Sequence, residues 1–435
     1  MLDIKFIREN VEVVKKAIVD KRADVDIDEL LDLDSQRRTL LTETESLQAT
    51  KNAVSKEIPQ LSPEDRKVKI LEMQEVDSRH TELSEKLKAI EAEYEALIQK
   101  VPNIPSHDTP VGPDESGNLV VREWGEPKKF SFTPKEHWEL GAALNLIDTE
   151  TASKVSGSRF AYLKGALALM EFGLIQIVMQ TLTQEDKLKK IIKNAGLLVP
   201  SVPFTPIIPP VFIKPDVFQR MGRLEPKEER YYIPSDDAYL IGSAEHTLGP
   251  LHMDKTIPES ELPIRYIGFS TAFRREAGSY GRDLKGILRV HQFDKLEMES
   301  FTTPDQSLAE QEFFVAIQEH LMQLLKLPYQ VVQICTGDMG GPDSRQIDIN
   351  TWMPGQNKYR ETHTSDLMTD YQSRRLNIKY KKAEGKTQLV HMNDATASAG
   401  RTLIAIMENY QQEDGSIVVP EVLRPYVGVD VIVRR

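Results

Sequence analysis

Apolar positions with helical spacing open the chain and then give way to heptad repeats. Between Ile4 and Ile18 an apolar residue recurs every three or four positions, which predicts an amphipathic helix. From about residue 27 to residue 100 the composition shifts to polar, helix-favouring residues, and apolar or aromatic residues recur at heptad positions. These positions are Leu33, Leu40, Leu47 and Val54, followed by Met73, Val76, His80, Leu83, Leu87, Ile90, Tyr94 and Leu97. In the second series the spacing alternates between three and four, which is the pattern of a coiled-coil seam.

A short break that begins at Pro59 separates the two heptad stretches. After it, Ser62 can cap a second helix, Pro63 suits the first helical position, and Asp65 completes a capping-box-like start. We therefore expect an antiparallel helical hairpin over residues 27–100. With a rise of ~1.5 Å per residue it would form an arm on the order of 45 Å long. A coiled coil between two copies of the chain would show the same periodicity.

The rest of the chain predicts a linker and a larger α+β domain. Residues 106–126 are rich in Pro, Gly and Asp, which is typical of a linker between residues 1–105 and residues 127–435. Beyond the linker, helical and strand patterns mix without a regular βαβ alternation. The sequence contains no Walker-type loop and no G-x-G-x-x-G fingerprint, so any ATP would be held by another architecture, such as an antiparallel sheet.

Composition and charge exclude several classes of protein and indicate a cellular compartment. The 435 residues carry a net charge of −12, which excludes a global basic field for nucleic acid but not a local basic surface. Cys335 is the only cysteine, so an internal disulfide and a cysteine-based zinc cluster are excluded, and a reducing, cytoplasmic setting fits best. The charged N-terminus predicts no signal peptide, and no apolar run reaches the length of a membrane span.

Residues 273–297 predict a β-hairpin with an unusually charged face. In the returning strand, expected to begin at Ile287, a period of two separates a charged and aromatic face from an apolar face. The first face holds Arg289, His291, Phe293, Lys295 and Glu297, and the second holds Leu288, Val290, Leu296 and Met298. Cations, a flat ring and a carboxylate together suit phosphates, a base and an ammonium group, which indicates ATP plus an amino acid. A salt-bridged surface hairpin is the alternative, although exposed ion pairs contribute only ~0–1 kcal/mol.

Three other segments carry candidate chemistry. An apolar strand that ends at Ser243 and Glu245 can hold a small polar ligand, although such pairs also cap helices. A strand is expected before Trp352, and beyond it Glu361 and Thr364 offer hard oxygen ligands for Mg²⁺. Arg401 opens an apolar helix after a run of small residues and can reach a phosphate there. If Arg401 were only a surface residue, its positive charge in the first turn of the helix would be slightly disfavoured by the helix dipole.

Together these segments resemble bacterial seryl-tRNA synthetases, and the resemblance covers nearly the whole chain. Residues 273–279 with 290–293 are similar to the second signature motif of class II synthetases, and residues 400–411 are similar to the third. Pro209 and Pro210 stand where the first motif ends. Further similar segments are residues 1–4, 7–10, 101–105, 335–338 and 419–426.

The resemblance implies a class II catalytic domain with an antiparallel sheet flanked by helices, preceded by a tRNA-binding arm. It implies an ATP-dependent serine–tRNA ligase that is a cytoplasmic homodimer acting on tRNA(Ser), and also on tRNA(Sec) where that tRNA exists. The alternatives are a catalytically silent tRNA-binding paralogue and an amino acid:carrier-protein ligase, although relatives of the latter kind lack the arm.

The resemblance also assigns roles to residues. It implies that Arg274, Glu361 and Arg401 are catalytic and that Glu361 and Thr364 hold Mg²⁺. The implied ATP-binding residues are Arg274, Arg275, Glu276, Val290, Phe293, Glu361, Thr362, His363, Thr364 and Arg401. The implied serine-binding residues are Ser243, Ala244, Glu245, Arg274, Glu297 and Ala395.

The chain departs from the family pattern near the amino-acid pocket. Ser243 replaces a threonine and keeps its hydroxyl, whereas Ala395 replaces the serine of the usual Asn-Gly-Ser. Thr396 can supply the missing hydroxyl after a small shift. Residues 361–364 read Glu-Thr-His-Thr in place of Glu-Ile-Ser-Ser, and residues 183–204 form a longer segment than usual.

Overall fold

The computed structural model describes residues 1–277 and 285–434, and the chain forms two compact units, Met1–Ile104 and Pro105–Arg435. The first unit consists of helices. They are α1 (Ile4–Glu9), α2 (Val11–Asp20), α3 (Ile27–Glu57) and α4 (Pro63–Ile98), with the short 3-10 turn η1 (Ile58–Gln60) between the last two. The expected opening helix is therefore two helices, because Asn10 leaves the helical conformation at φ −133° and ψ 42°.

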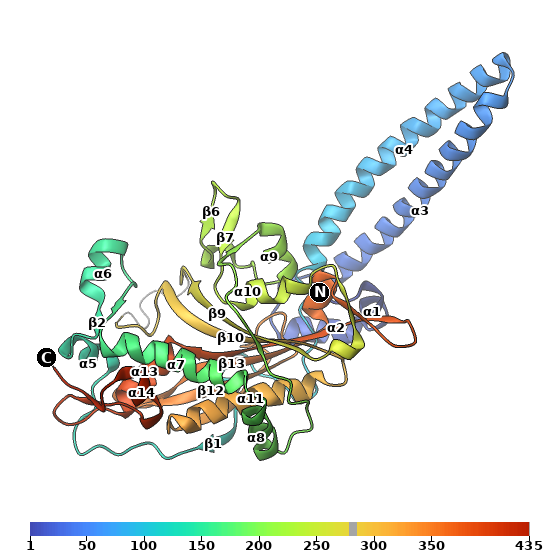
Figure 1. Cartoon of the computed structure of the whole chain (residues 1–435). Coiled ribbons are helices and arrows are strands. Elements are labelled where there is room, and N and C mark those ends of the chain that lie inside the picture. The colour runs from blue at the N-terminus through green and yellow to red at the C-terminus, as the bar shows by residue number, and fades with distance from the viewer. Residues whose placement is uncertain (278–284, 435) are drawn as a thin grey trace. The chain divides into compact units, whose positions relative to one another are not determined.

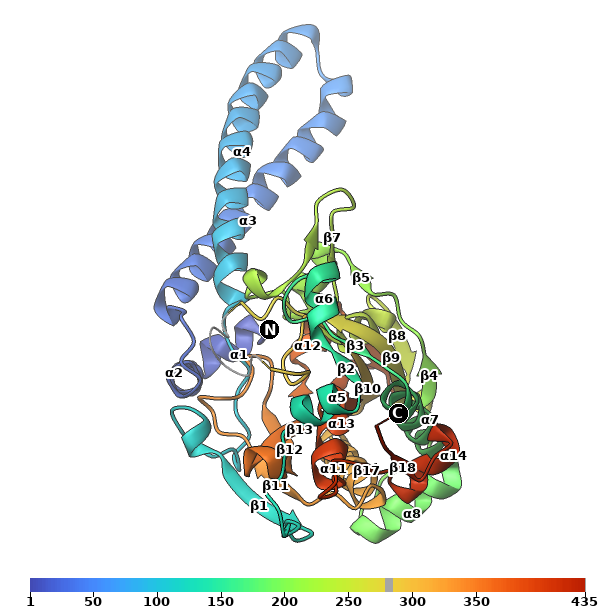
Figure 2. The same cartoon turned by 90° about the vertical axis from the view of Figure 1, so that its left-hand side faces the viewer.

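The long helices α3 and α4 form the expected antiparallel hairpin (Figures 1 and 2). Ion pairs join Arg37 to Glu91 at 3.3 Å and Lys51 to Asp77 at 2.7 Å, so the numbers rise along one helix as they fall along the other. Ser62 caps α4 by accepting a hydrogen bond from the backbone N–H of Asp65 at 3.2 Å, as predicted. The two heptad stretches thus pair within one chain.

The second unit is built on an eight-stranded sheet with the order β1-β11-β12-β13-β16-β10-β9-β4. Neighbours are antiparallel except β4 and β9, which are parallel. In this order the strands are β1 (Leu119–Trp124), β11 (Tyr329–Gln333), β12 (Arg345–Met353), β13 (Lys358–Thr369), β16 (His391–Ala399), β10 (Gln292–Thr302), β9 (Ile264–Phe273) and β4 (Thr205–Ile207). The mixed fold with a mainly antiparallel sheet is confirmed, as is the strand expected before Trp352.

Helices cover the sheet and complete the unit. The longer ones are α7 (Ala166–Leu182), α8 (Glu185–Ala195), α11 (Ser307–Leu324) and α13 (Gly400–Asn409). The shorter ones are α5 (His137–Ala143), α6 (Thr149–Ser156), α9 (Pro215–Met221), α10 (Glu245–Leu248), α12 (Tyr371–Leu376) and α14 (Arg424–Val427). Small sheets are formed by β2 (Ile147–Asp148), β3 (Tyr162–Leu163), β5 (Phe212–Ile213), β6 (Tyr232–Ile233), β7 (Ala238–Leu240), β8 (Thr256–Pro258), β14 (Lys379–Lys381), β15 (Thr387–Leu389), β17 (Ile417–Val418) and β18 (Val431–Ile432).

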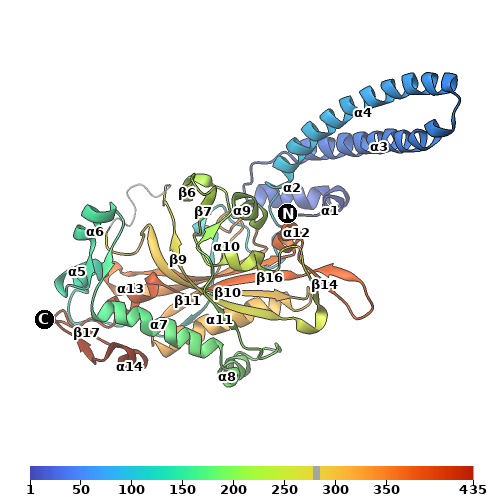
Figure 3. The same ribbon diagram turned by 45° about the horizontal axis from the view of Figure 1, so that its top comes forward.

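One face of the central strands is packed with apolar side chains. Helices α7, α8 and α11 lie on this face (Figure 3), and α11 contributes Phe313 and Phe314 to its core. From the strands, Leu296 and Met298 of β10 and Ala395 of β16 point into the same core. Because successive strand residues alternate between faces, the intervening polar residues are directed to the opposite face.

Two expectations about local structure are corrected. The interpretation of residues 106–126 as a linker is wrong in its last part, because β1 pairs with β11 along the edge of the sheet. The returning strand of the charged hairpin begins at Gln292 rather than at Ile287, and Arg289 and His291 precede it. The long segment 183–204 contains the helix α8, which buries Leu188, Ile191 and Ile192 in the core.

Within residues 1–277 and 285–434, no single helix is long and apolar enough to cross a membrane. Helices α7 and α8 meet that criterion only when taken together, and the chain bends by 80° between them.

Candidate active site

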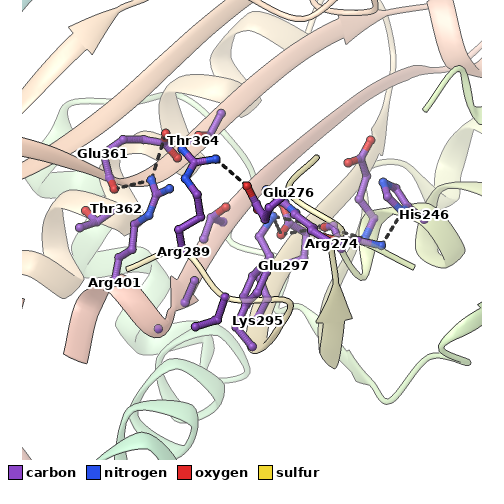
Figure 4. A pocket seen from close by; sticks show the side chains of 18 of the residues that line it. His246, Arg274, Glu276, Arg289, Lys295, Glu297, Glu361, Thr362, Thr364 and Arg401 are labelled. Atoms are coloured by element: carbon purple, nitrogen blue, oxygen red, sulfur yellow. Dashed lines mark hydrogen bonds and ion pairs between the residues drawn. The ribbon is translucent and has the colours of Figure 1, made fainter. Parts of the chain in front are cut away.

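A cavity of about 630 Å³ lies over the polar face of the central strands (Figure 4). The sequence-predicted residues that line it are Ser243, Glu245, Arg274, Glu276, Val290, Phe293, Glu297, Glu361, Thr362, Thr364 and Arg401. They come from the connection between β9 and β10, from β10 and β13, and from the beginnings of α10 and α13. Residues that are far apart in the sequence therefore meet at one cavity.

Arg274 and Phe293 form one side of this cavity. The Nε of Arg274 donates a hydrogen bond to the carbonyl of Gly242 at 3.0 Å, and its guanidinium carbon lies 5.3 Å from the centre of the Phe293 ring. The backbone N–H of Arg274 donates a hydrogen bond to the backbone carbonyl of His291 at 3.0 Å, which fixes the backbone at Arg274. The guanidinium therefore has a defined direction, which suits bidentate binding of a phosphate.

Glu276 and Arg289 form an ion pair at the rim of the same side. Nη1 of Arg289 lies 2.5 Å from Oε2 of Glu276, and the two are drawn together in Figure 4. Residues 278, 279 and 281 of the predicted hairpin loop lie outside the residues that the structure describes.

Arg401 and Glu361 form the opposite side of the cavity. Nη1 of Arg401 lies 2.9 Å from the backbone carbonyl of Glu361 and 3.2 Å from its carboxylate Oε2 (Figure 4). Partial burial raises the pKa of Glu361, but Arg401 and Arg274 outweigh it and hold the pKa below its usual range. Glu361 is therefore an ionised, half-exposed carboxylate beside two cations.

The donor set at Glu361 and Thr364 fits Mg²⁺ that is shared with a nucleotide. Mg²⁺ usually keeps several waters and takes one or two protein carboxylates together with substrate phosphates. Here the carboxylate of Glu361 and the hydroxyl of Thr364 line one wall, and Asp348 pairs with Thr364 across the strands. Within the described residues, no cluster of three or more His, Cys, Asp or Glu forms an all-protein metal cage.

At the other end of the cavity, Glu245 is held as an anion. Nε of Arg223 donates to its Oε1 at 2.7 Å, and Nε2 of Gln372 donates to the same oxygen at 3.1 Å. Burial raises the pKa of Glu245, but the Arg223 charge outweighs it and lowers the pKa to about 2. A buried carboxylate that keeps its charge is suited to an ammonium group.

Glu297 lies beside Ser243 and Lys295. Nζ of Lys295 is 2.5 Å from Oε2 of Glu297, and the Ser243 hydroxyl donates to the same oxygen at 3.3 Å. Burial raises the pKa of Glu297 above its usual range, against the opposing effect of Lys295. The polar side chains at this end fit an amino acid with a short hydroxylated side chain.

The structure does not bring four of the predicted residues to the cavity wall. Ala244 and His363 are fully buried elsewhere, and Arg275 places its guanidinium 6.0 Å from the Tyr231 ring. Ala395 belongs to the apolar core on the far face of the sheet. Its neighbours Asp394 and Thr396 line the cavity instead, because the faces of β16 alternate.

Several wall residues are not among the assigned ATP-binding or serine-binding residues: Arg223, Glu229, Arg230, His246, Arg289, Lys295, Asp366, Asp394 and Thr396. The strand pattern alone places Arg289 and Lys295 on the charged face of the hairpin. Thr396 is the residue expected to supply the hydroxyl that is missing at Ala395. Arg223 lies two residues beyond the end of α9, and no periodic pattern in the sequence marks it. Asp366 lies two residues beyond Thr364 on the same face of β13. Because alternate residues of a strand share a face, Asp366 could have been predicted from Thr364.

His363 supports a prediction about stability. Its ring is fully buried, Nδ1 is 2.9 Å from the Thr362 hydroxyl, and burial lowers its pKa to about 4. The unfolded chain, with an ordinary pKa near 6.5, binds a proton first, so the free energy of unfolding falls as the pH drops from about 6.5 to 4. We expect the wild type to lose about 2 kcal/mol more than His363→Gln between pH 7 and pH 5. Urea unfolding at both pH values measures this difference, and equal losses would contradict it.

Comparisons with known proteins agree with the geometry. Residues 230–410 match the core domain of class II tRNA synthetases (G, H, P, S and T), and residues 1–105 match the seryl-tRNA synthetase N-terminal domain. The chain is 40% identical to the serine–tRNA ligase of Symbiobacterium thermophilum, over 100% of both chains. It is 44% identical to that of Thermosipho melanesiensis, over 99% of this chain and 100% of the relative.

Solved structures give the same result. Seryl-tRNA synthetase from Pyrococcus horikoshii, complexed with ATP, superposes with a TM-score of 0.86 at 34% identity and covers 100% of each chain. The cytoplasmic serine–tRNA ligase from Naegleria fowleri, in complex with AMP, gives a TM-score of 0.82 at 30% identity over 100% of this chain and 99% of the other. With this similarity along its whole length, the chain belongs to the seryl-tRNA synthetase family.

Proposed function

We propose that this chain is an ATP-dependent serine–tRNA ligase and that its two reactions take place in the cavity described above. In the first step a carboxylate oxygen of serine attacks the α-phosphorus of ATP, and the bond to the leaving pyrophosphate breaks. In the second step a hydroxyl of the terminal tRNA ribose attacks the seryl carbonyl, and AMP leaves. The observation that carries the proposal is one cavity with a cationic phosphate end and an anionic amino-acid end.

At the phosphate end, Arg274 binds the α-phosphate and Arg401 binds the γ-phosphate, while Phe293 stacks on the adenine. Glu276 helps to seat the nucleotide through its ion pair with Arg289. Mg²⁺, held by Glu361 and Thr364, would neutralise the phosphate charge when bound. Such a site works by positioning and charge neutralisation and requires no protein nucleophile.

At the amino-acid end, Glu245 receives the serine ammonium group and Glu297 receives the hydroxyl end. Ser243 and Thr396 add hydroxyls to the same wall. In a catalytically silent paralogue nothing would require both ends of the cavity to be complete. Here Arg274, Phe293, Glu297, Glu361 and Arg401 all line it, as expected of an active enzyme.

The partners follow from the same proposal. The helical arm formed by α3 and α4 grips tRNA(Ser), and tRNA(Sec) is charged with serine where it exists. We further propose that the enzyme works as a homodimer in the cytoplasm.

The deciding experiment is amino-acid-dependent exchange of labelled pyrophosphate into ATP. Serine is expected to support exchange much more strongly than threonine, alanine or glycine. Absence of exchange with every amino acid would refute the enzymatic function, and a preference for alanine or glycine would refute the assignment of serine.

Thr396→Val tests which residue supplies the hydroxyl of the serine pocket. The change removes the hydroxyl and keeps the branched shape, and a lost buried hydrogen bond costs about 1–3 kcal/mol. We therefore expect the serine kcat/KM in exchange to fall by about tenfold to a hundredfold, with the ATP KM unchanged. The matched control is Ala395→Ser, which would place a hydroxyl in the apolar core and is expected to lower stability without tightening serine binding. A gain in serine affinity in that control would show that Ala395 faces the pocket.

A further inference from the structure

Arg223 lies where four carboxylates from separate parts of the fold meet. Its guanidinium is 2.7 Å from Glu245, 3.3 Å from Asp343, 3.4 Å from Asp366 and 3.5 Å from Asp394. These residues belong to α10, to the loop before β12, to β13 and to β16. The Arg223 side chain is 16% exposed and lines the cavity at its amino-acid end.

The contacts at Glu245 are directional. The hydrogen bonds from Arg223 and Gln372 both reach Oε1, so Oε2 is the oxygen that is left to meet an ammonium group. The backbone N–H of Glu245 is held separately, by the Ser243 hydroxyl at 3.3 Å. Arg223 therefore determines how the Glu245 side chain is turned.

Arg223 also counters the negative charge of the carboxylates that surround it. Asp394 and Asp366 line the cavity beside Glu245, and Glu299 is fully buried beneath with neither carboxyl oxygen hydrogen-bonded to a described residue. Burial and mutual repulsion raise the pKa of Asp366, Asp394 and Glu299 even beside the guanidinium, whereas the 2.7 Å contact with Arg223 keeps Glu245 charged. A protonated or rotated Glu245 would bind an ammonium group poorly.

On these grounds we propose that Arg223 is a positioning residue for the amino-acid pocket, which acts through Glu245 and does not itself contact the nucleotide. The inference rests on the proposed function of the cavity. It predicts that disturbing Arg223 affects the amino acid and spares ATP.

Arg223→Lys tests this in serine-dependent exchange, because lysine keeps the charge and loses the planar fork. The serine KM is expected to rise at least about tenfold, with the ATP KM changed less than about twofold. The matched control is Arg220→Gln on the neighbouring helix, whose ion pair with Asp254 at 2.9 Å lies outside the cavity, and both KM values should stay at the wild-type level. Equal rises in the two KM values of Arg223→Lys would overturn the inference.

A double-mutant cycle with Glu245→Gln tests whether the effect passes through Glu245. If it does, the loss of serine kcat/KM in the double mutant is no larger than in Glu245→Gln alone. Losses that multiply would overturn the inference.

Asp343→Asn is the second variant if Arg223→Lys does not fold. Asp343 contacts Arg223 at 3.3 Å and is not part of the cavity wall, so its substitution disturbs the surroundings of Arg223 without removing a group that lines the cavity. A rise of about threefold in the serine KM alone supports the inference, and an unchanged serine KM refutes it. If the wild type shows no exchange with serine at all, the proposed function itself is refuted. An active enzyme whose serine KM does not change when Arg223 is substituted refutes only the inference about Arg223.

Discussion

Arg274→Ala is expected to lower serine-dependent pyrophosphate exchange by about 10³-fold or more, which is the cost of removing a preorganised donor from developing charge. The side chain is held in advance by the Gly242 carbonyl at 3.0 Å and lies over the Phe293 ring. Little reorganisation is therefore needed when a phosphate arrives. The loss should appear mainly in kcat, because the contact strengthens as charge develops on the transferred group.

Two further substitutions test whether the reaction needs the geometry of Arg274 or only its positive charge. Arg274→Lys keeps the charge without the fork and should recover only a small part of the activity. Arg275→Ala removes the adjacent guanidinium, which lies near the Tyr231 ring and not on the cavity wall, and should cost less than about tenfold. Equal effects of Arg274→Ala and Arg275→Ala would mean that general positive charge, and not the geometry of Arg274, is what the reaction needs.

The sequence was sufficient for the elements whose patterns are periodic. The heptads of the arm, the cap at Ser62 and the alternating strand before Trp352 are all found where they were expected. At the site, residues with strong local signals such as Arg274, Phe293 and Arg401 meet at one cavity. These signals are local, so a single sequence carries them.

Other features depend on contacts between distant segments, which no local pattern reveals. The strand β10 begins late because the residues before it are held by other elements. Ile287 N–H donates to Nε2 of His137 at 3.1 Å, and His291 N–H donates to the carbonyl of Arg159 at 2.9 Å. For the same reason β1 was concealed in a proline-rich segment, since its partner β11 lies about 200 residues further on.

At the proposed amino-acid pocket the sequence left one question open, which is whether residue 395 or residue 396 faces the ligand. A strand shifted by one position exchanges its two faces, so the choice between Ala395 and Thr396 required the strand register. In the structure Ala395 pairs with Met298, a core residue, while Thr396 pairs with Glu297 on the cavity side. Arg223 could not be found at all from the sequence, because its partners Glu245 and Asp394 are distant in the chain and its own segment is irregular.

Shortening the helical arm is expected to abolish charging of tRNA while sparing the activation of serine. All the cavity residues belong to the unit Pro105–Arg435, and the arm belongs to Met1–Ile104. Replacing residues 41–87 by a short Gly/Ser turn keeps the Arg37–Glu91 ion pair and removes the outer part of both helices in register. Pyrophosphate exchange should stay within about threefold of the wild type, as for sites that share no partners.

Aminoacylation of tRNA(Ser) by the same variant should fall by about a hundredfold or more, which corresponds to losing about 3 kcal/mol of tRNA binding. Because tRNA contacts release counterions, aminoacylation by the wild type should also weaken with added salt more steeply than exchange does. A melting curve of the shortened protein provides the control for folding. Loss of exchange together with charging would mean that the arm supports the catalytic unit itself. Retention of both would mean that the tRNA is bound elsewhere, and either result would refute the role proposed for α3 and α4.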